Sequence, residues 1–156
     1  MTRRPVTREP IRVSVQRLPG AEDIPLPDYA TPGAAALDLR AAVDSEVILH
    51  PGERKLIPTG IRVAIPEGFE GQVRPRSGLA LKHGIALVNS PGTIDADYRG
   101  PVQVIMVNLG GEPFTIRRGD RIAQLVIATV TRVVLEETGS LPDTERSSGG
   151  FGSTGI

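Results

Sequence analysis

The chain has 156 residues, which is the length of a single domain, and its 18 Lys and Arg balance its 18 Asp and Glu. A net charge of zero argues against nucleic acid as a partner, and no run approaches the roughly 20 apolar residues of a membrane span. Cysteine is absent, which excludes disulfides and thiolate metal sites and is typical of a reducing, cytoplasmic compartment. Aromatic residues make up only 3%, so the core depends on aliphatic side chains, and a small core of this kind favours association into an oligomer.

The chain begins with a weakly basic segment, residues 1–10, which we expect to be a loose N-terminal arm. Short runs rich in β-branched residues then recur between Pro/Gly turns, and such runs predict strands. We expect strands at 11–18, 47–49, 55–65, 69–73, 85–88, 102–109, 114–116 and 122–135. One short helix is predicted at 78–83, with Gly84 as its C-terminal cap.

Many short strands with turn residues throughout predict an all-β fold, a jelly roll or distorted β-barrel with one short helix. After about residue 138, Gly, Ser, Pro and charged residues replace the apolar pattern. We therefore divide the chain into the N-terminal arm, a β domain at 11–138, and a flexible C-terminal arm at 139–156.

Residues 89–100 read Asn-Ser-Pro-Gly-Thr-Ile-Asp-Ala-Asp-Tyr-Arg-Gly and lie between two predicted strands, as the turn of a hairpin. A narrow hairpin can present backbone groups to the edge of a flat ligand, and Asp95 at the start of the return strand can orient a water molecule. An ordinary surface turn remains the alternative, because Asn, Pro, Gly and Asp are turn residues for local reasons.

Residues 74–80 read Arg-Pro-Arg-Ser-Gly-Leu-Ala and include the predicted start of the helix. Ser77 and Gly78 would then offer free N–H groups to an anion, and Arg76 would add a forked donor for phosphate oxygens. The alternative is a serine cap beside solvated arginines. Asp38 in an apolar segment and Gln124 after a Gly-Asp-Arg turn are weaker signals, since each also fits a purely structural role.

The last residues are rich in glycine and contain one guanidinium, from Arg146, and one aromatic ring, from Phe151. Glycine lets a backbone approach a ligand closely, and Ser153 and Thr154 suit phosphate oxygens. This composition is typical of a lid that closes over a ligand, although most Gly/Ser-rich termini are simply disordered.

Taken in order, these segments resemble the five motifs of the homotrimeric dUTPase family, the dUTP nucleotidohydrolases, over about residues 26–155. The resemblance implies a β jelly roll and a homotrimer with active sites shared between subunits. It implies Mg²⁺-assisted hydrolysis of dUTP to dUMP and pyrophosphate, by in-line attack of water on the α-phosphorus. Such an enzyme keeps uracil out of DNA and supplies dUMP for thymidylate synthesis.

By the same resemblance, the 89–100 segment would hold the nucleoside. Asp95 is similar to the aspartate that activates the attacking water. Tyr98 is similar to the ring that packs on the deoxyribose and leaves no room for a 2′-hydroxyl. Asn89, with the hairpin residues Thr93 and Ile94, is similar to the part that recognises uracil.

The resemblance assigns the phosphate chain to Arg76, Ser77, Gly78 and Gln124. It assigns Asp38 to Mg²⁺, with contact through water rather than directly.

The C-terminal arm of one subunit would close over a pocket built by the others. Phe151 would stack on uracil, and Arg146, Gly152, Ser153 and Thr154 would contact the terminal phosphates.

Two other functions are open alternatives. The dCTP deaminases resemble dUTPases, but they carry a catalytic glutamate where this chain has Ile105, and isoleucine cannot transfer protons. The second alternative is a trimer that binds a nucleotide as a sensor without turning it over.

Overall fold

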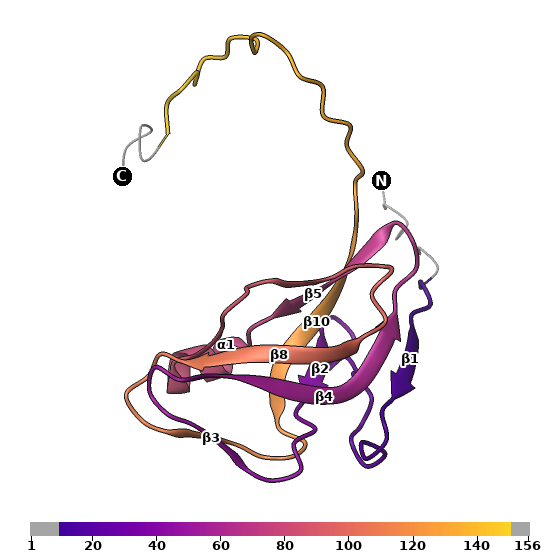
Figure 1. The fold of residues 1–156 in the computed structure, drawn as a ribbon, viewed down its shortest axis with the longest axis vertical. Helices are drawn as coiled ribbons and strands as arrows, with labels where there is room; N and C mark the ends of the chain where they lie inside the picture. Colours follow the sequence, from indigo (N-terminus) through magenta and orange to yellow (C-terminus); the bar gives the residue numbers. More distant parts are fainter. Residues whose placement is uncertain (1–9, 151–156) are drawn as a thin grey trace, which may run out of the picture.

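The structure, a computed structural model, describes residues 10–150. Within that range the chain forms ten strands and one short helix (Figure 1). In chain order they are β1 (Ser14–Arg17), β2 (Leu37–Arg40), β3 (Val47–Leu49), β4 (Arg54–Ala64), β5 (Phe69–Arg74), α1 (Ser77–His83), β6 (Ile85–Leu87), β7 (Gly92–Ile94), β8 (Pro101–Asn108), β9 (Phe114–Ile116) and β10 (Arg121–Thr129).

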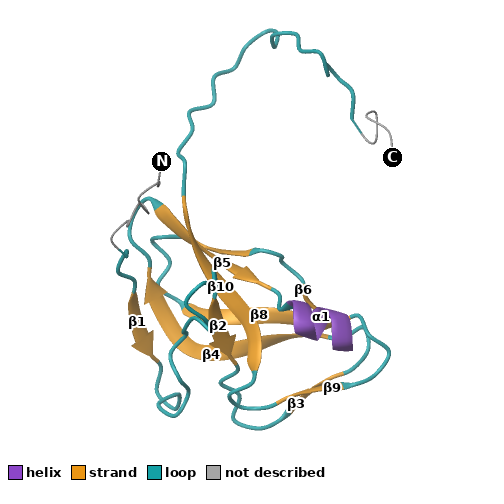
Figure 2. Cartoon of the chain, turned by 180° about the vertical axis from the view of Figure 1, so that it is seen from behind, coloured by secondary structure: helices purple, strands orange, loops and turns teal. Residues whose placement is uncertain are grey.

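The strands form two four-stranded sheets, ordered β1-β4-β8-β6 and β2-β10-β5-β7, and a small sheet of β3 with β9. Every pairing between these strands is antiparallel. Strands far apart in the sequence lie side by side, and the helix lies at one end of the sheets (Figure 2). The prediction of an all-β fold with one short helix is confirmed, although the two sheets of the described residues do not close into a barrel.

The hydrophobic core lies between the two large sheets, and strand β8 shows how the sequence builds it. Val102, Val104 and Met106 are buried there, whereas the alternate side chains of Gln103 and Ile105 point outward. This alternation follows from the two-residue repeat of a strand. Nearly all the buried side chains are aliphatic, as the low aromatic content predicted.

Two predicted strands are too long by several residues, and two further strands were not predicted. The strand predicted at 11–18 is confined to β1, Ser14–Arg17. Strand β10 ends at Thr129 instead of continuing to residue 135, because its partner β5 begins at Phe69, opposite Thr129. Beyond that pair there is no further strand residue of β5 to pair with, and Val134 and Leu135 are 88% and 92% exposed. The strands β2 and β7 were not predicted, because β2 has no β-branched residue and β7 lies among turn residues, and each is defined by its pairing, β2 with β10 and β7 with β5. The division of the chain at residue 139 stays a prediction.

Helix α1 begins at Ser77, one residue earlier than predicted, and its N-cap is Arg76 without a side-chain capping bond. The alternative of a serine cap is therefore wrong. Gly84 caps the C-terminus as predicted, with φ of 67° and its N–H directed at the carbonyls of Leu79 and Ala80. With seven residues, this helix is far too short to cross a membrane, and no other helix occurs in residues 10–150.

Candidate functional site

The segment predicted as a hairpin turn connects the two large sheets. Strands β6 and β8 pair on either side of it, with Leu87 opposite Met106, which confirms the predicted hairpin partners. Between them the chain crosses to the second sheet, where β7 pairs with β5 and Thr93 lies opposite Gln72. The residues between β6 and β8 are therefore held from both sheets, and the peptide bond from Ser90 to Pro91 is cis.

A pocket of about 220 Å³ lies along this segment and β8. Four of the predicted nucleoside residues line it together: Asn89, Thr93, Ile94 and Tyr98. The rest of its wall is mostly aliphatic, from Leu56, Val73, Leu87, Gly92, Pro101, Val102, Gln103, Val104 and Ile105. We call this cavity the hairpin pocket. Its aliphatic side chains, together with the polar side chains of Asn89, Thr93, Tyr98 and Gln103, suit a flat ring that is polar at its edge.

Tyr98 is held in place by its own turn. Its backbone N–H donates to the carbonyl of Asp95 at 3.1 Å, and its hydroxyl donates to the carbonyl of Pro101 at 3.1 Å. The ring covers Gly100 so closely that a Cβ added there would lie 2.3 Å from the tyrosine oxygen. Gly100 is therefore what allows the ring to lie against the backbone.

Asp95 follows β7 directly and is exposed, so its carboxylate is open to solvent. It does not belong to the lining of the hairpin pocket, although its carbonyl anchors Tyr98. In the chain described here, the predicted catalytic aspartate thus lies beside the pocket rather than in it.

A second pocket, of about 420 Å³, lies over the sheet β2-β10-β5-β7. Asp38 on β2, Gln124 on β10 and Arg74 on β5 are direct neighbours across the three strands, so their side chains share one face. The lining consists of Ala30, Ala34, Ala35, Ala36, Asp38, Arg74, Arg76, Ser77, Gly78, Arg121, Gln124 and Val126. This cavity, the arginine pocket, brings together every residue predicted to contact the phosphate chain or Mg²⁺ from the body of the chain.

Asp38 lies between two arginines in this pocket. Its carboxylate is 3.4 Å from Arg76 Nε and 3.2 Å from Arg121 Nη1, and the aspartate side chain is 17% exposed. Arg76 also donates to the carbonyl of Arg121 at 2.9 Å, and Gln124 Nε2 donates to the carbonyl of Pro75 at 3.0 Å. One carboxylate thus orients two guanidinium groups in a single pocket.

Sequence reasoning missed two members of the arginine pocket, Arg74 and Arg121. Both lie in segments that already contain a predicted site residue. Arg74 is in the segment of Arg76, and Arg121 is in the segment of Gln124. The strand period alone does not find Arg74, because it puts Arg74 on a face with Gln72, which does not line the arginine pocket; the pairing of Arg74 with Gln124 does. Sequence alone does not show that Arg121 faces Asp38, since that depends on the pairing of β10 with β2.

The two pockets have no lining residue in common. Residues predicted for the nucleoside and residues predicted for the phosphates therefore line separate cavities of one chain. Arg146 lines neither of them, and its Nε donates to the carbonyl of Gly149 at 2.8 Å within the segment after β10 (Figure 1). Phe151, Gly152, Ser153 and Thr154 lie outside the described residues.

An all-β fold that holds a pocket of aliphatic and polar side chains and a second pocket lined by arginines suits a protein that binds a nucleotide. A family model for dUTPase matches residues 22–155. The chain therefore belongs to the dUTPase family, and its activity is that of a nucleotidohydrolase acting on dUTP.

Two curated relatives carry the name deoxyuridine 5′-triphosphate nucleotidohydrolase. The protein from Methylocella silvestris is 58% identical over 149 residues, which cover 94% of this chain and 93% of the relative. The protein from Wolbachia sp. subsp. Brugia malayi is 55% identical over 152 residues, which cover 96% of this chain and 97% of the relative.

Solved structures of phage dUTPases share the fold. The dUTPase of Staphylococcus bacteriophage 80alpha with dUPNHPP is 26% identical, with a TM-score of 0.84 over 93% of this chain and 99% of that one. A variant dUTPase from phage phi11 of S. aureus, described with a structural Mg(II) ion, is 25% identical, with a TM-score of 0.74 over 83% of this chain and 98% of that one. These neighbours confirm the jelly-roll fold.

Proposed function

We propose that this enzyme hydrolyses dUTP to dUMP and pyrophosphate, with Asp95 activating a water molecule for in-line attack on the α-phosphorus. The observation that carries the proposal is the presence in one chain of the hairpin pocket, with aliphatic and polar side chains, and of the arginine pocket. A ring and a triphosphate are the two parts of a nucleotide that such cavities select. Hydrolysis of this kind removes dUTP before it enters DNA and supplies dUMP for thymidylate synthesis.

The hairpin pocket would take the uracil and the deoxyribose. Asn89 and the backbone around Thr93 and Ile94 provide polar groups at the edge of the base, and the close wall would exclude the methyl group of thymine. Tyr98, fixed by its two hydrogen bonds, would cover the sugar at C2′ and exclude a ribose hydroxyl.

The arginine pocket would take the triphosphate. Arg76 offers a forked donor, and Ser77, Gly78 and Gln124 add hydroxyl, backbone and amide groups around the same cavity. Little covalent chemistry is needed from the protein, because phosphoryl transfer depends mostly on positioning and on neutralisation of charge.

The residues present fit Mg²⁺ in only one way. Residues 10–150 contain no group of three His, Cys, Asp or Glu side chains that could enclose a metal ion, and Asp38 is a lone carboxylate in the arginine pocket. Such a residue would hold the ion through water, leaving the inner positions to phosphate oxygens. When bound to the triphosphate, Mg²⁺ would neutralise part of its charge.

We further propose that the enzyme is a homotrimer in which neighbouring subunits combine their pockets. The hairpin pocket and the arginine pocket share no lining residue within one chain, and two copies that face each other would bring a pocket of each kind together. The sheet β4-β8-β6 supports association beside the hairpin pocket. Val88, whose N–H donates to the carbonyl of Ile105 at 3.0 Å, is an apolar residue that is 54% exposed and lines neither pocket. The C-terminal arm of a further subunit, with Phe151 on the base, would then close the site. The cytoplasmic location stays a prediction.

The deaminase alternative is disfavoured by the pocket wall. Ile105 lines the hairpin pocket beside Leu56, so an aliphatic surface stands where a deaminase would require a proton-transferring side chain.

The decisive experiment is to replace Asp95 with asparagine and to measure pyrophosphate release from dUTP with Mg²⁺. We expect kcat to fall by about 10²–10⁴-fold while dUTP still binds, because an amide cannot accept the proton of the attacking water. Asp97→Asn is the matched control, since Asp97 is an exposed aspartate two residues further on. Its replacement should leave the rate of pyrophosphate release unchanged.

The unchanged protein should release pyrophosphate from dUTP and not from dTTP, dCTP or UTP. Full activity of Asp95→Asn would overturn the role of Asp95. Ammonia from dCTP would move the protein to the deaminases, and binding without any turnover would leave a nucleotide sensor.

A further inference from the structure

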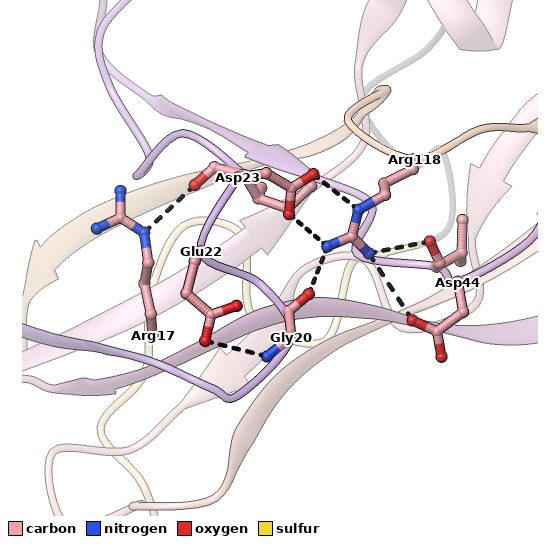
Figure 3. A network of polar contacts seen from close by, with 8 residues as sticks. Arg17, Gly20, Glu22, Asp23, Asp44 and Arg118 are labelled. Atoms are coloured by element: carbon pink, nitrogen blue, oxygen red, sulfur yellow. Dashed lines mark hydrogen bonds and ion pairs between the residues drawn. The ribbon is translucent and has the colours of Figure 1, made fainter.

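Arg118 lies in the turn between β9 and β10 and makes a cluster of polar contacts that the proposed function does not use (Figure 3). Its side chain is 29% exposed, although most arginines are largely solvated. The guanidinium reaches two other loops of the chain, so a single side chain joins three segments that are far apart in the sequence.

The first segment is the loop after β1. Arg118 Nε donates to Asp23 Oδ2 at 2.9 Å, and Nη2 donates to Asp23 Oδ1 and to the carbonyl of Gly20. The second segment follows β2, where Nη1 donates to the carbonyl of Val43 at 3.1 Å and lies 3.9 Å from Asp44 Oδ1. Figure 3 shows the guanidinium between these acceptors.

The turn that carries Arg118 leads directly into the arginine pocket. Backbone bonds join this turn to the end of β2, from Gly119 N to the carbonyl of Ala41 and from Ala41 N to the carbonyl of Asp120, each at 2.8 Å. The next residue, Arg121, begins β10 and contacts Asp38. A displaced turn would therefore displace one of the two guanidinium groups beside Asp38.

The loop held by Arg118 also leads to that pocket, from the other side. It continues through the buried Ile24 to Asp28, whose carbonyl accepts from Asp38 N at 3.0 Å. The next residue, Tyr29, bridges to Leu37, and Ala30 lines the arginine pocket. Both walls beside Asp38 are thus connected to Arg118.

We propose that Arg118 is a positioning residue for the triphosphate, which holds the arginine pocket in shape without touching the substrate. This inference rests on the proposed function, because it assigns the arginine pocket to the phosphate chain. It predicts that loss of Arg118 weakens recognition of a triphosphate and leaves recognition of the nucleoside intact.

The test compares binding of dUMP and of the imido analogue dUpNHpp, by calorimetry with Mg²⁺, in the protein and in Arg118→Ala. We expect the analogue to bind about five- to tenfold more weakly, because a displaced Arg121 would lose one or two charge-assisted hydrogen bonds to the phosphates. We expect dUMP to bind as before. Arg118→Lys should recover only part of the loss, because an ammonium has one nitrogen to reach acceptors in two loops.

Arg117→Ala is the matched control, since its side chain is exposed and pairs only with Glu46 among the described residues. If Arg118→Ala does not fold, Asp23→Asn removes the carboxylate partner of Arg118 at an exposed position. This variant should also bind the analogue more weakly. Equal weakening of both ligands, or no weakening of either, would overturn the positioning role. If the unchanged protein hydrolyses no dUTP but binds the analogue, the proposed function fails and the positioning role is judged from binding alone.

Discussion

At the scale of single residues, the most constrained contact in the hairpin pocket is between Tyr98 and Gly100. The tyrosine ring lies over the glycine at a distance that leaves no room for a side chain. Selection against a ribose hydroxyl would therefore depend on a residue that itself makes no contact with the sugar. Glycine at this position is required for close approach rather than for backbone freedom, since its φ is not in the left-handed region.

We expect Gly100→Ala to displace Tyr98 and to lower kcat/KM for dUTP by about ten- to hundredfold, because small misplacements at a reacting centre have effects of this size. Discrimination against UTP should fall as well. Gly111→Ala is the control, since a Cβ added at Gly111 meets nothing within 4 Å. Steady-state kinetics with dUTP and with UTP checks this prediction. An unchanged ratio of kcat/KM for dUTP to kcat/KM for UTP would contradict it.

The residues of the arginine pocket show how far side chains could be predicted from sequence. Arg76, Ser77, Gly78 and Gln124 were expected to meet an anion together, and they do line one cavity. Arg121 was not predicted, because its contact with Asp38 depends on the pairing of two strands more than eighty positions apart. No local pattern encodes such a register.

At the scale of elements, the loop after β1 and the turn before β10 are held together by the charges of Asp23 and Arg118. The hydrogen bond from Arg118 holds the pKa of Asp23 below its usual value, and Asp23 in turn raises the pKa of Arg118. A lowered carboxyl pKa in the folded state stabilises the protein above the unfolded pKa of 3.8. That contribution is lost as the pH falls through the folded pKa, when the carboxylate is protonated.

We therefore expect Asp23→Asn to lower Tm at about pH 6 and to have no effect once the pH is well below the carboxyl pKa. The difference should be small, because the aspartate side chain is 64% exposed. Calorimetric unfolding of both proteins across this range checks it. A difference in Tm that persists in strong acid would mean that Asp23 contributes by something other than its charge.

Strands were predictable where the β-branched run and its pairing partner have the same length. The segments 47–49 and 114–116 match β3 and β9 residue for residue. The last strand was overestimated, because β propensity continues through Val134 while the partner strand does not. The strand β7 was concealed by turn residues, and only its pairing with β5 makes it a strand.

At the scale of the whole molecule, the outward face of β4, β8 and β6 is the surface least explained by one chain alone. Val88, directly after β6, is 54% exposed and lines neither pocket, although the other face of this sheet is the core. Burying such a face against a second copy would remove apolar area from water and bring pockets of different chains together.

We expect Val88→Glu to weaken self-association and to reduce activity in parallel, since a charge would be forced into the contact. Val88 is exposed in the single chain and lines neither the hairpin nor the arginine pocket, so the subunit itself should still fold. Ile48→Glu is the control, a similarly exposed isoleucine on the small sheet. Light scattering after size exclusion, with activity measured over a dilution series, checks this. A trimer that survives Val88→Glu would place the contact elsewhere.

The end of β10 at Thr129 has a consequence for how the arm would act. From there to Gly150 the chain has no helix or strand and extends away from the sheets (Figure 1). Fully extended, these roughly twenty residues would span about 70 Å, which is enough to reach a pocket on another copy. A tether of this kind keeps its end at a local concentration on the order of millimolar, whatever the amount of enzyme in solution. Closure would then depend on the length and the anchor of the tether as much as on the contacts made at its tip.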